Sequence, residues 1–176
     1  MAIDRQKTET VHWHAVFTAS RAEKKVRDRL EELGVECFLP VQTVLRQWTY
    51  RKSRVVVPVI AGLVFVRVGR QEQVKVLQTK GVVAFLRLKG EAGGAVIPDK
   101  QMVDFRFLLD FSEEAVEMTN ENIKAGDLVR VVKGSLRGME GELIRHKGVT
   151  KVLVRIDMLG CAMVNIPASF VEKLNK

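Results

Sequence analysis

The sequence is poor in cysteine, and its two cysteines lie far apart. Cys37 and Cys161 form no CxxC pair, which excludes a disulfide framework and the clustered thiolates of a structural zinc site. We expect both to be reduced thiols that pack as small apolar groups. His12 and His14 would share one face of a strand, but no cluster of further ligands accompanies them, so a structural role is expected. We expect no metal and no cofactor.

Long apolar runs are also missing. The longest, 55–66, is interrupted by Pro58 and Gly62 and is shorter than the ~20 residues of a membrane-spanning helix. The first ten residues are polar and charged, unlike a secretory signal. No Ser/His/Asp set, phosphate-binding glycine loop or paired-carboxylate motif occurs. These absences indicate a cytoplasmic protein that neither enters a membrane nor catalyses a reaction.

Positive charge, in contrast, is plentiful. The 176 residues include 29 Lys and Arg against 21 Asp and Glu, a formal net charge of +8, and 47% of the chain is hydrophobic. This is the composition of a folded chain, long enough for one sizeable core or two small ones. Net positive charge attracts phosphate-bearing ligands and favours a nucleic-acid partner. Many small basic domains bind none, so charge alone leaves the question open.

The pattern over 10–110 predicts an α+β domain. Alternation predicts a first strand over 11–18, and Ser20–Glu23 is typical of a capping box at a helix start. Gly34 stands where this helix should end. The further predicted strands are 35–45, 55–60, 63–68 and 82–88, and the further helices are 71–79, anchored by Val74 and Leu77, and 98–109. This order fits a ferredoxin-like fold, an antiparallel sheet with helices on one face.

The composition changes after residue 110. Segment 111–125 has four glutamates, one lysine and few apolar residues, so we expect an acidic linker, partly helical at its start. From residue 126 to 176, short β-type runs alternate with glycines. The runs are 128–132, 141–145, 149–156 and 162–166. They predict a second, small all-β barrel.

Two sets of motifs resemble a known family. Gly126–Val131, followed by Gly134, Gly138 and Gly141, resembles the KOW motif of SH3-like barrels, with Val129 and Val131 facing inward. Earlier segments resemble, in the right order, the N-terminal (NGN) domain of NusG-type transcription factors. They are Trp13–Val16, Ala19–Val26, Phe38–Pro40, Ile60–Val66, Lys80–Leu86 and Ile97–Asp99.

The resemblance implies a transcription elongation factor without enzymatic activity. Its N-terminal domain would bind the clamp coiled coil of bacterial RNA polymerase, bridge the cleft and suppress pausing. The sequence departs from the family at Ile60–Leu63, where Phe-Pro-Gly-Tyr is usual. It departs again at Leu159–Cys161 and Val164–Ile166, where Leu-Gly-Arg and Pro-Val-Glu are usual. These departures suggest a specialised antiterminator, similar to the UpxY-like or RfaH-like paralogues that act on polysaccharide operons.

The resemblance also implies which residues touch polymerase. Trp13, Ile60 and Leu63 would form an apolar patch for the clamp, with ordinary core packing as the alternative, most of all for Leu63. Glu72 and Gln73 would contact the opposite side of the cleft, with a plain surface helix as the alternative.

A third set of residues surrounds a predicted hairpin tip. No acidic residue occurs between Val41 and Ile60. Cations bind phosphates and aromatic rings stack on unpaired bases, which suits upstream or non-template DNA; a solvated tip is the alternative. The residues are Arg46, Trp48, Tyr50, Arg51, Lys52 and Arg54.

The barrel would hold a second partner, at Met158, Leu159 and Cys161. The family resemblance implies nascent RNA, a ribosomal protein or the Rho terminator. Two other functions stay open, a ribosome-associated RNA-binding KOW protein and a general NusG that assists Rho. We expect a monomer.

Overall fold

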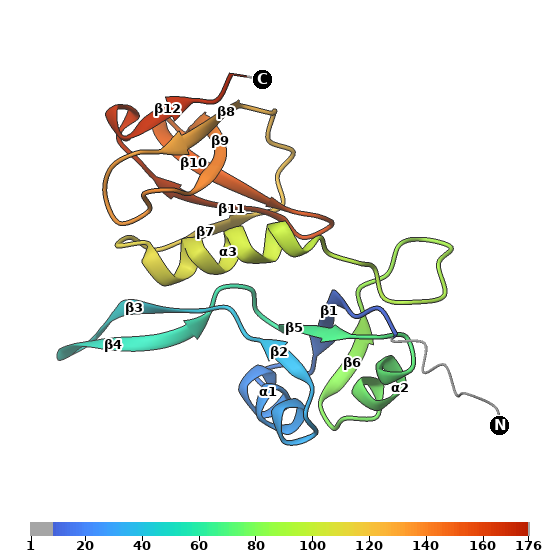
Figure 1. Cartoon of the computed structure of the whole chain (residues 1–176). Coiled ribbons are helices and arrows are strands. Elements are labelled where there is room, and N and C mark those ends of the chain that lie inside the picture. The colour runs from blue at the N-terminus through green and yellow to red at the C-terminus, as the bar shows by residue number, and fades with distance from the viewer. Residues whose placement is uncertain (1–8, 176) are drawn as a thin grey trace. The chain divides into compact units, whose positions relative to one another are not determined.

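The computed structural model describes residues 9–175 and divides into two compact units (Figure 1). Unit 1 comprises the described residues of Met1–Leu39 together with Ala61–Ile97. Unit 2 comprises Pro40–Ile60 and Pro98–Lys176, again as far as they are described. Among the described residues, no helix combines the length and the apolar character that crossing a bilayer requires.

Unit 1 is a four-stranded antiparallel sheet with two helices. The strands lie in the order β2-β5-β1-β6. The elements are β1 (His12–Thr18), α1 (Glu23–Glu32), β2 (Glu36–Phe38), β5 (Leu63–Val68), α2 (Glu72–Leu77) and β6 (Val82–Phe85). Residues 13–16 of β1 and 63–66 of β5 are all buried, so both faces of the central strands are shielded from water. The predicted order of elements and the ferredoxin-like antiparallel sheet are confirmed.

The start of α1 differs from the prediction. The helix begins at Glu23 with Ala22 as its N-cap, and no side chain caps it, so the capping box at Ser20 is wrong. The Glu23 carboxylate instead accepts a hydrogen bond from the Gly62 N–H at 2.7 Å. The end of the helix follows the sequence: Gly34 has φ +75°, a conformation that glycine adopts without strain.

Unit 2 contains a two-stranded hairpin, one helix and a six-stranded antiparallel sheet (Figure 1). The hairpin pairs β3 (Val41–Trp48) with β4 (Arg51–Pro58), and the helix is α3 (Asp99–Phe111). The sheet has the order β12-β8-β9-β10-β11-β7. Its elements are β7 (Glu117–Thr119), β8 (Asp127–Val131), β9 (Glu140–His146), β10 (Val149–Ile156), β11 (Gly160–Asn165) and β12 (Val171–Lys173), with a 3-10 turn at Ala168–Phe170 before β12.

The small barrel is built on the predicted apolar positions. Val129 and Val131 are buried, as the alternation in β8 predicts. Ile144, Leu153, Cys161 and Met163 form one buried cluster, against which Ile123 packs. The all-β character of this region is therefore confirmed.

Four element predictions were wrong in detail. The strand predicted over 35–45 is interrupted before Pro40, which lacks the N–H that a central strand donates. The strand predicted over 82–88 ends at Phe85. In α2, Val76 is buried, whereas the predicted anchors Val74 and Leu77 are exposed.

The predicted linker is the fourth correction. Glu117–Thr119 forms β7, which pairs with β11, and Val116 beside it is buried. An acidic composition does not prevent strand formation here because the edge of β11 supplies the hydrogen-bonding partners. The domain limits at residues 110 and 126 stay a prediction.

Candidate nucleic-acid interface

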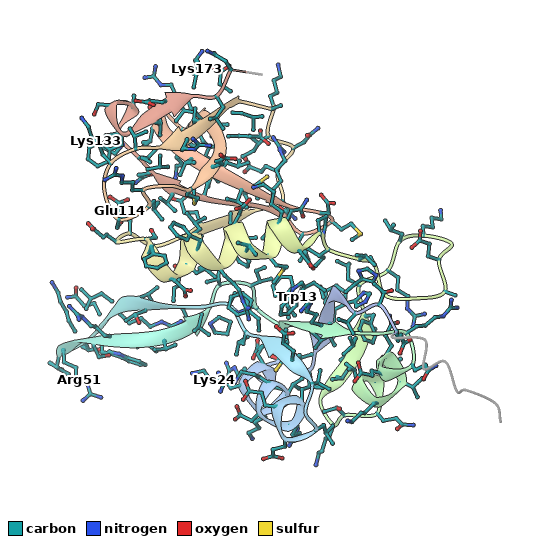
Figure 2. The ribbon with its side chains drawn as sticks, viewed as in Figure 1. Trp13, Lys24, Arg51, Glu114, Lys133 and Lys173 are labelled. Carbon is teal, nitrogen blue, oxygen red and sulfur yellow. The ribbon has the colours of Figure 1, made fainter. Side chains whose placement is uncertain are left out.

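The β3–β4 hairpin carries all six residues predicted to contact nucleic acid. The two strands pair continuously from Val41↔Pro58 to Trp48↔Arg51, so most of the predicted tip is strand and only residues 49 and 50 form the turn. All six side chains are exposed; Tyr50 at the turn is 98% exposed and Trp48 is 54% exposed. Arg51 projects near the free end of the hairpin (Figure 2). We call β3 and β4 with these six residues the cationic hairpin.

The register divides these residues between two faces. Residues directly opposite in an antiparallel pair share a face, and the faces alternate along each strand. Trp48↔Arg51 and Arg46↔Ser53 therefore lie on one face, which we call the Trp48 face. Gln47↔Lys52 and Leu45↔Arg54 lie on the other, the Lys52 face. The sequence predicted the cluster but not this division.

The charge of the cationic hairpin is uncompensated. Among the described residues, no hydrogen bond or ion pair involves the side chains of the four cations, which are Arg46, Arg51, Lys52 and Arg54. Trp48, in contrast, has one fixed contact, because its Nε1–H donates to the Ser53 Oγ at 3.0 Å. Free cations beside an exposed ring suit a phosphate backbone with accessible bases.

The predicted polymerase patch is only partly accessible. Trp13 is 5% exposed and Leu63 is 1% exposed, so both are core residues and their side chains are not available to a partner in this structure. Ile60, which follows β4, is half-buried and remains accessible. Core packing, the alternative that the sequence left open, is what the structure shows for Trp13 and Leu63, because both lie in central strands of the unit 1 sheet. A polymerase contact at this patch stays a prediction.

Glu72 and Gln73 form bonds within unit 1. The Glu72 carboxylate accepts from the Gly69 N–H at 3.3 Å, just before α2. The Gln73 Oε1 accepts from the Gly94 N–H at 3.2 Å, and its Nε2 lies 3.5 Å from the His14 Nε2. Gln73 therefore holds α2 against β1 and the 91–97 loop, whereas Glu72 stays exposed.

His14 is a buried histidine, as its predicted structural role requires. Its Nδ1 donates to the Ala95 carbonyl at 3.0 Å, and its ring meets Phe85 edge to face. Burial lowers the pKa of His14 below its ordinary value. Within residues 9–175, no three His, Cys, Asp or Glu side chains are grouped so as to hold a metal ion.

The barrel turn shows which of its predicted contact residues are accessible. Met158 is exposed at φ +65°, and Leu159 is half-buried. Cys161 is 3% exposed and belongs to the barrel core, so its side chain is not available to a partner. Burial raises the pKa of the Cys161 thiol, and burial also raises that of Cys37, to about 11. Both cysteines are free thiols, as predicted, but only Cys161 packs in an apolar cluster. Cys37 is half-buried, and its thiol donates toward the Arg27 carbonyl at 3.6 Å.

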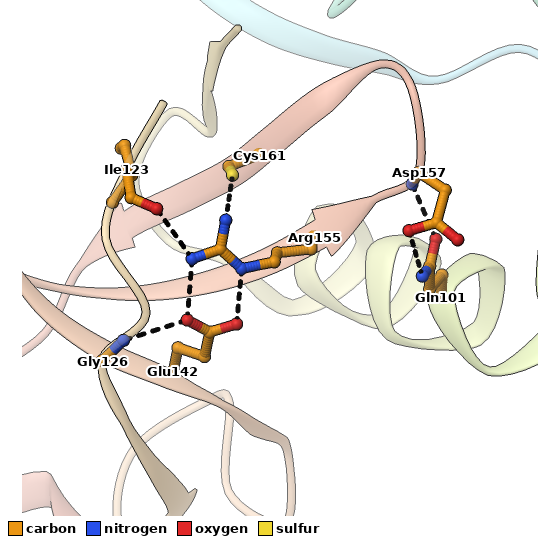
Figure 3. Close-up of polar contacts among 7 residues, drawn as sticks. All are labelled: Gln101, Ile123, Gly126, Glu142, Arg155, Asp157 and Cys161. Carbon is orange, nitrogen blue, oxygen red and sulfur yellow. Dashed lines mark hydrogen bonds and ion pairs between the residues drawn. The ribbon is translucent and has the colours of Figure 1, made fainter. Parts of the chain in front are cut away.

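A polar network fixes the barrel around Arg155 (Figure 3). Its Nε and Nη2 donate to the Glu142 carboxylate at 2.6 and 2.9 Å, and Nη2 also donates to the Ile123 carbonyl. Glu142 accepts a third bond from the Gly126 N–H. The hydrogen bonds from Arg155 are the main reason that the pKa of the Glu142 carboxyl lies below its ordinary value. The network ties 123–126 to the sheet, so these residues stabilise the barrel.

Two glutamines form paired bonds that the sequence did not reveal. Gln42 donates to the Val116 carbonyl at 3.2 Å and accepts from the Val116 N–H at 2.8 Å. The Gln101 side chain donates to the Asp157 carboxylate at 2.9 Å and accepts from the Asp157 N–H at 2.8 Å (Figure 3). An isolated glutamine in a strand or helix carries no sequence pattern that marks such a bond.

Comparisons with known proteins agree with the motifs. A family model described as "Transcription termination factor nusG" matches residues 11–106, more than half of the chain. No curated protein matches the sequence.

Solved structures with a similar fold include one described as "Domain interaction in Thermotoga maritima NusG". It has a TM-score of 0.50 and 22% sequence identity, and the match covers 94% of this chain and 98% of that chain. The MjSpt4:Spt5 complex in conformation B is similar at 17% identity and a TM-score of 0.31, over 93% of this chain and 97% of that chain. The first match supports the fold, whereas the second is too distant to carry an argument.

Proposed function

The chain belongs to the NusG family of transcription factors, and from this membership we propose that it binds elongating RNA polymerase and promotes read-through. The N-terminal domain, 10–110, would bridge the polymerase cleft at the clamp coiled coil and suppress pausing. Such a factor binds one conformation of its partner more tightly than the others and so increases the population of that conformation. This needs no catalytic residue. The barrel, 126–176, would bring a second partner close by increasing its local concentration.

The observation that carries the proposal is the cationic hairpin. Among the described residues, the four cations of this hairpin have no carboxylate partner, and two exposed rings accompany them, Trp48 in β3 and Tyr50 in the turn. Phosphate contacts from such a surface would hold the factor at the upstream edge of the transcription bubble. This supports a role at the elongation complex, where DNA or nascent RNA lies beside the polymerase surface.

The polymerase contact would depend on Ile60. The Ile60 side chain is accessible, whereas those of Trp13 and Leu63 are buried and would act only by packing the unit 1 sheet. Glu72 is the accessible candidate for the opposite side of the cleft. In the barrel, Met158 and Leu159 are the accessible candidates for the second partner, which is Rho, a ribosomal protein or nascent RNA.

A specialised antiterminator is the version of this function that the sequence favours. The altered Ile60–Leu63 and Leu159–Cys161 segments depart from the family's usual residues. A general factor that assists Rho is the second candidate, favoured by the description of the matching family model as a termination factor.

In-vitro elongation by purified bacterial RNA polymerase tests the proposal, on a template with a known pause and a Rho-dependent terminator. Shorter pauses with more read-through are expected for the wild-type chain. Stronger termination with Rho would instead indicate the general factor. The variant Ile60→Asp should lose the effect while its melting temperature is unchanged.

A chain that neither changes elongation nor binds core polymerase would contradict the proposal. Co-purification with ribosomes and not with polymerase would indicate the ribosome-associated function instead.

A further inference from the structure

We propose that the two faces of the cationic hairpin have different tasks: the Trp48 face binds single-stranded nucleic acid by base stacking, and the Lys52 face contacts only phosphates. This inference rests on the proposed function in that it assigns the ligand of the same hairpin. It goes further because it predicts which residues distinguish unpaired from paired nucleic acid.

The arrangement of the Trp48 face supports stacking. Arg51 lies directly opposite Trp48 across the strands, and Arg46 lies two residues before it on the same face. A base resting on the indole would therefore have two cations nearby that can meet its flanking phosphates. No acidic residue occurs anywhere between 41 and 60, so nothing on the hairpin repels the backbone.

The Trp48–Ser53 hydrogen bond prepares the ring for this contact. The indole N–H is a donor only, and Ser53 satisfies it at 3.0 Å. The bond restricts the rotamer of a side chain that is nevertheless 54% exposed, so its aromatic surface remains open. A ring held in place loses less conformational entropy when a base stacks on it. Ser53 is thus a positioning residue.

The Lys52 face lacks the same ability. It carries Lys52 and Arg54 opposite Gln47 and Leu45, and it has no aromatic ring. Its cations can contact phosphates of paired or unpaired strands alike. Tyr50 belongs to neither face, because it lies in the turn between the strands.

Binding measurements on the full chain test the assignment with three probes: short oligo(dT), the same length of abasic single strand, and a duplex of equal length. Trp48→Leu should lower the affinity for oligo(dT) about 5- to 150-fold, the range for removing the ring under one stacked base. Its affinity for the abasic strand and the duplex should change less than about twofold, because neither offers an unpaired base. Tyr50→Leu removes the other exposed ring of the hairpin and should lower the affinity for oligo(dT) by a smaller factor than Trp48→Leu, because Tyr50 lies in the turn and outside the Trp48 face.

Two charge-matched double variants compare the faces. Arg46→Gln/Arg51→Gln should weaken oligo(dT) binding more than Lys52→Gln/Arg54→Gln, although each removes two positive charges. Ser53→Ala should lower affinity for oligo(dT) by a smaller factor than Trp48→Leu and leave the abasic strand unaffected, whereas Ser53→Thr should restore binding.

Fluorescence gives an independent readout of the ring. The chain has two tryptophans, and Trp13 is buried, so quenching on addition of oligo(dT) reports mainly on Trp48. Quenching by oligo(dT) and none by the abasic strand is expected. Equal losses of affinity from both double variants, or from Trp48→Leu and Tyr50→Leu, would overturn the assignment.

The same variants separate this inference from the proposed function. If wild-type protein alters pausing but Trp48→Leu binds oligo(dT) normally, the face assignment fails and the elongation role stands. If the face-specific pattern appears but the protein neither binds polymerase nor alters pausing, the assignment stands and the elongation role fails.

Discussion

At the scale of single residues, burial decides what each side chain does. Trp13, Leu63 and Cys161 match family positions expected to meet a partner, yet all three are core residues here. A buried apolar side chain stabilises the fold by packing and offers no surface to a partner. His14 is the polar counterpart, since it is buried with both ring nitrogens facing polar neighbours.

His14 should make the fold sensitive to acid. Its pKa in the folded protein lies below the ordinary 6.5, so the unfolded chain takes up a proton at this residue before the folded chain does. Protonation would also point a second N–H at the Gln73 amide. The free energy of unfolding should therefore be unaffected above 6.5 and fall as the pH decreases from 6.5 toward the lower folded pKa.

Urea unfolding at several pH values measures this effect. His14→Gln removes the titration and should flatten the dependence in that window. An unchanged slope in His14→Gln would assign the acid sensitivity to other groups.

At the scale of elements, contacts between residues distant in sequence replace the local contacts that the sequence predicts. Ser20–Glu23 has the sequence of a capping box, but the Glu23 carboxylate accepts a hydrogen bond from the N–H of Gly62, which is distant in sequence. The same glutamate therefore joins α1 to the turn before β5. In the hairpin, pairing between β3 and β4 divides one run of basic residues between two faces.

Two single substitutions distinguish the local cap from the tertiary bond. Glu23→Ala should reduce the free energy of unfolding by about 1–3 kcal/mol, because the Gly62 N–H loses its acceptor. Ser20→Ala should change it by less than about 0.5 kcal/mol, as for an exposed residue without a cap role.

Glu23→Gln keeps an acceptor oxygen, so its effect on the free energy of unfolding should lie between those of Glu23→Ala and Ser20→Ala. A larger effect of Ser20→Ala than of Glu23→Ala, in thermal or denaturant unfolding, would restore the capping box.

At the scale of the whole molecule, the position of charge matters more than its total. The formal net charge of +8 produces a general attraction for polyanions. The four cations of the hairpin, which have no partner among residues 9–175, concentrate that attraction on one ribbon. The cations in the ion pairs of the described residues lie in other elements. Specific phosphate contacts and the general field can be separated by salt dependence.

Neutralising Arg51, Lys52 and Arg54 to Gln should flatten the dependence of single-strand affinity on salt. In a plot of log affinity against log salt, the slope should change by about 0.7 for each phosphate that the variant no longer neutralises.

The control triple variant Lys24→Gln/Lys25→Gln/Lys80→Gln removes the same total charge from exposed positions of unit 1. Its slope should stay close to that of the wild type. Equal slopes for both triple variants would mean that net charge, and not the hairpin, binds the polyanion.

The sequence by itself determined the family and most of the elements. Helical spacing and a terminal glycine located α1, alternation located β1 and β8, and ordered motifs identified a NusG-type chain, which the family model confirms. These properties are local: each depends on residues within a few positions of one another, so a single chain displays them. The basic, acid-free run at 41–60 was visible for the same reason.

Only the tertiary structure decided which side chains are accessible and on which face of a strand pair each residue lies. Glu117–Thr119 is a strand because β11 offers it an edge, and Trp13 and Leu63 are buried because they lie in the two central strands of one sheet. The faces of the cationic hairpin follow from register, and a shift of one residue would exchange them. Burial and register arise from pairing between distant segments, and their energies depend on neighbours that a local sequence pattern does not contain.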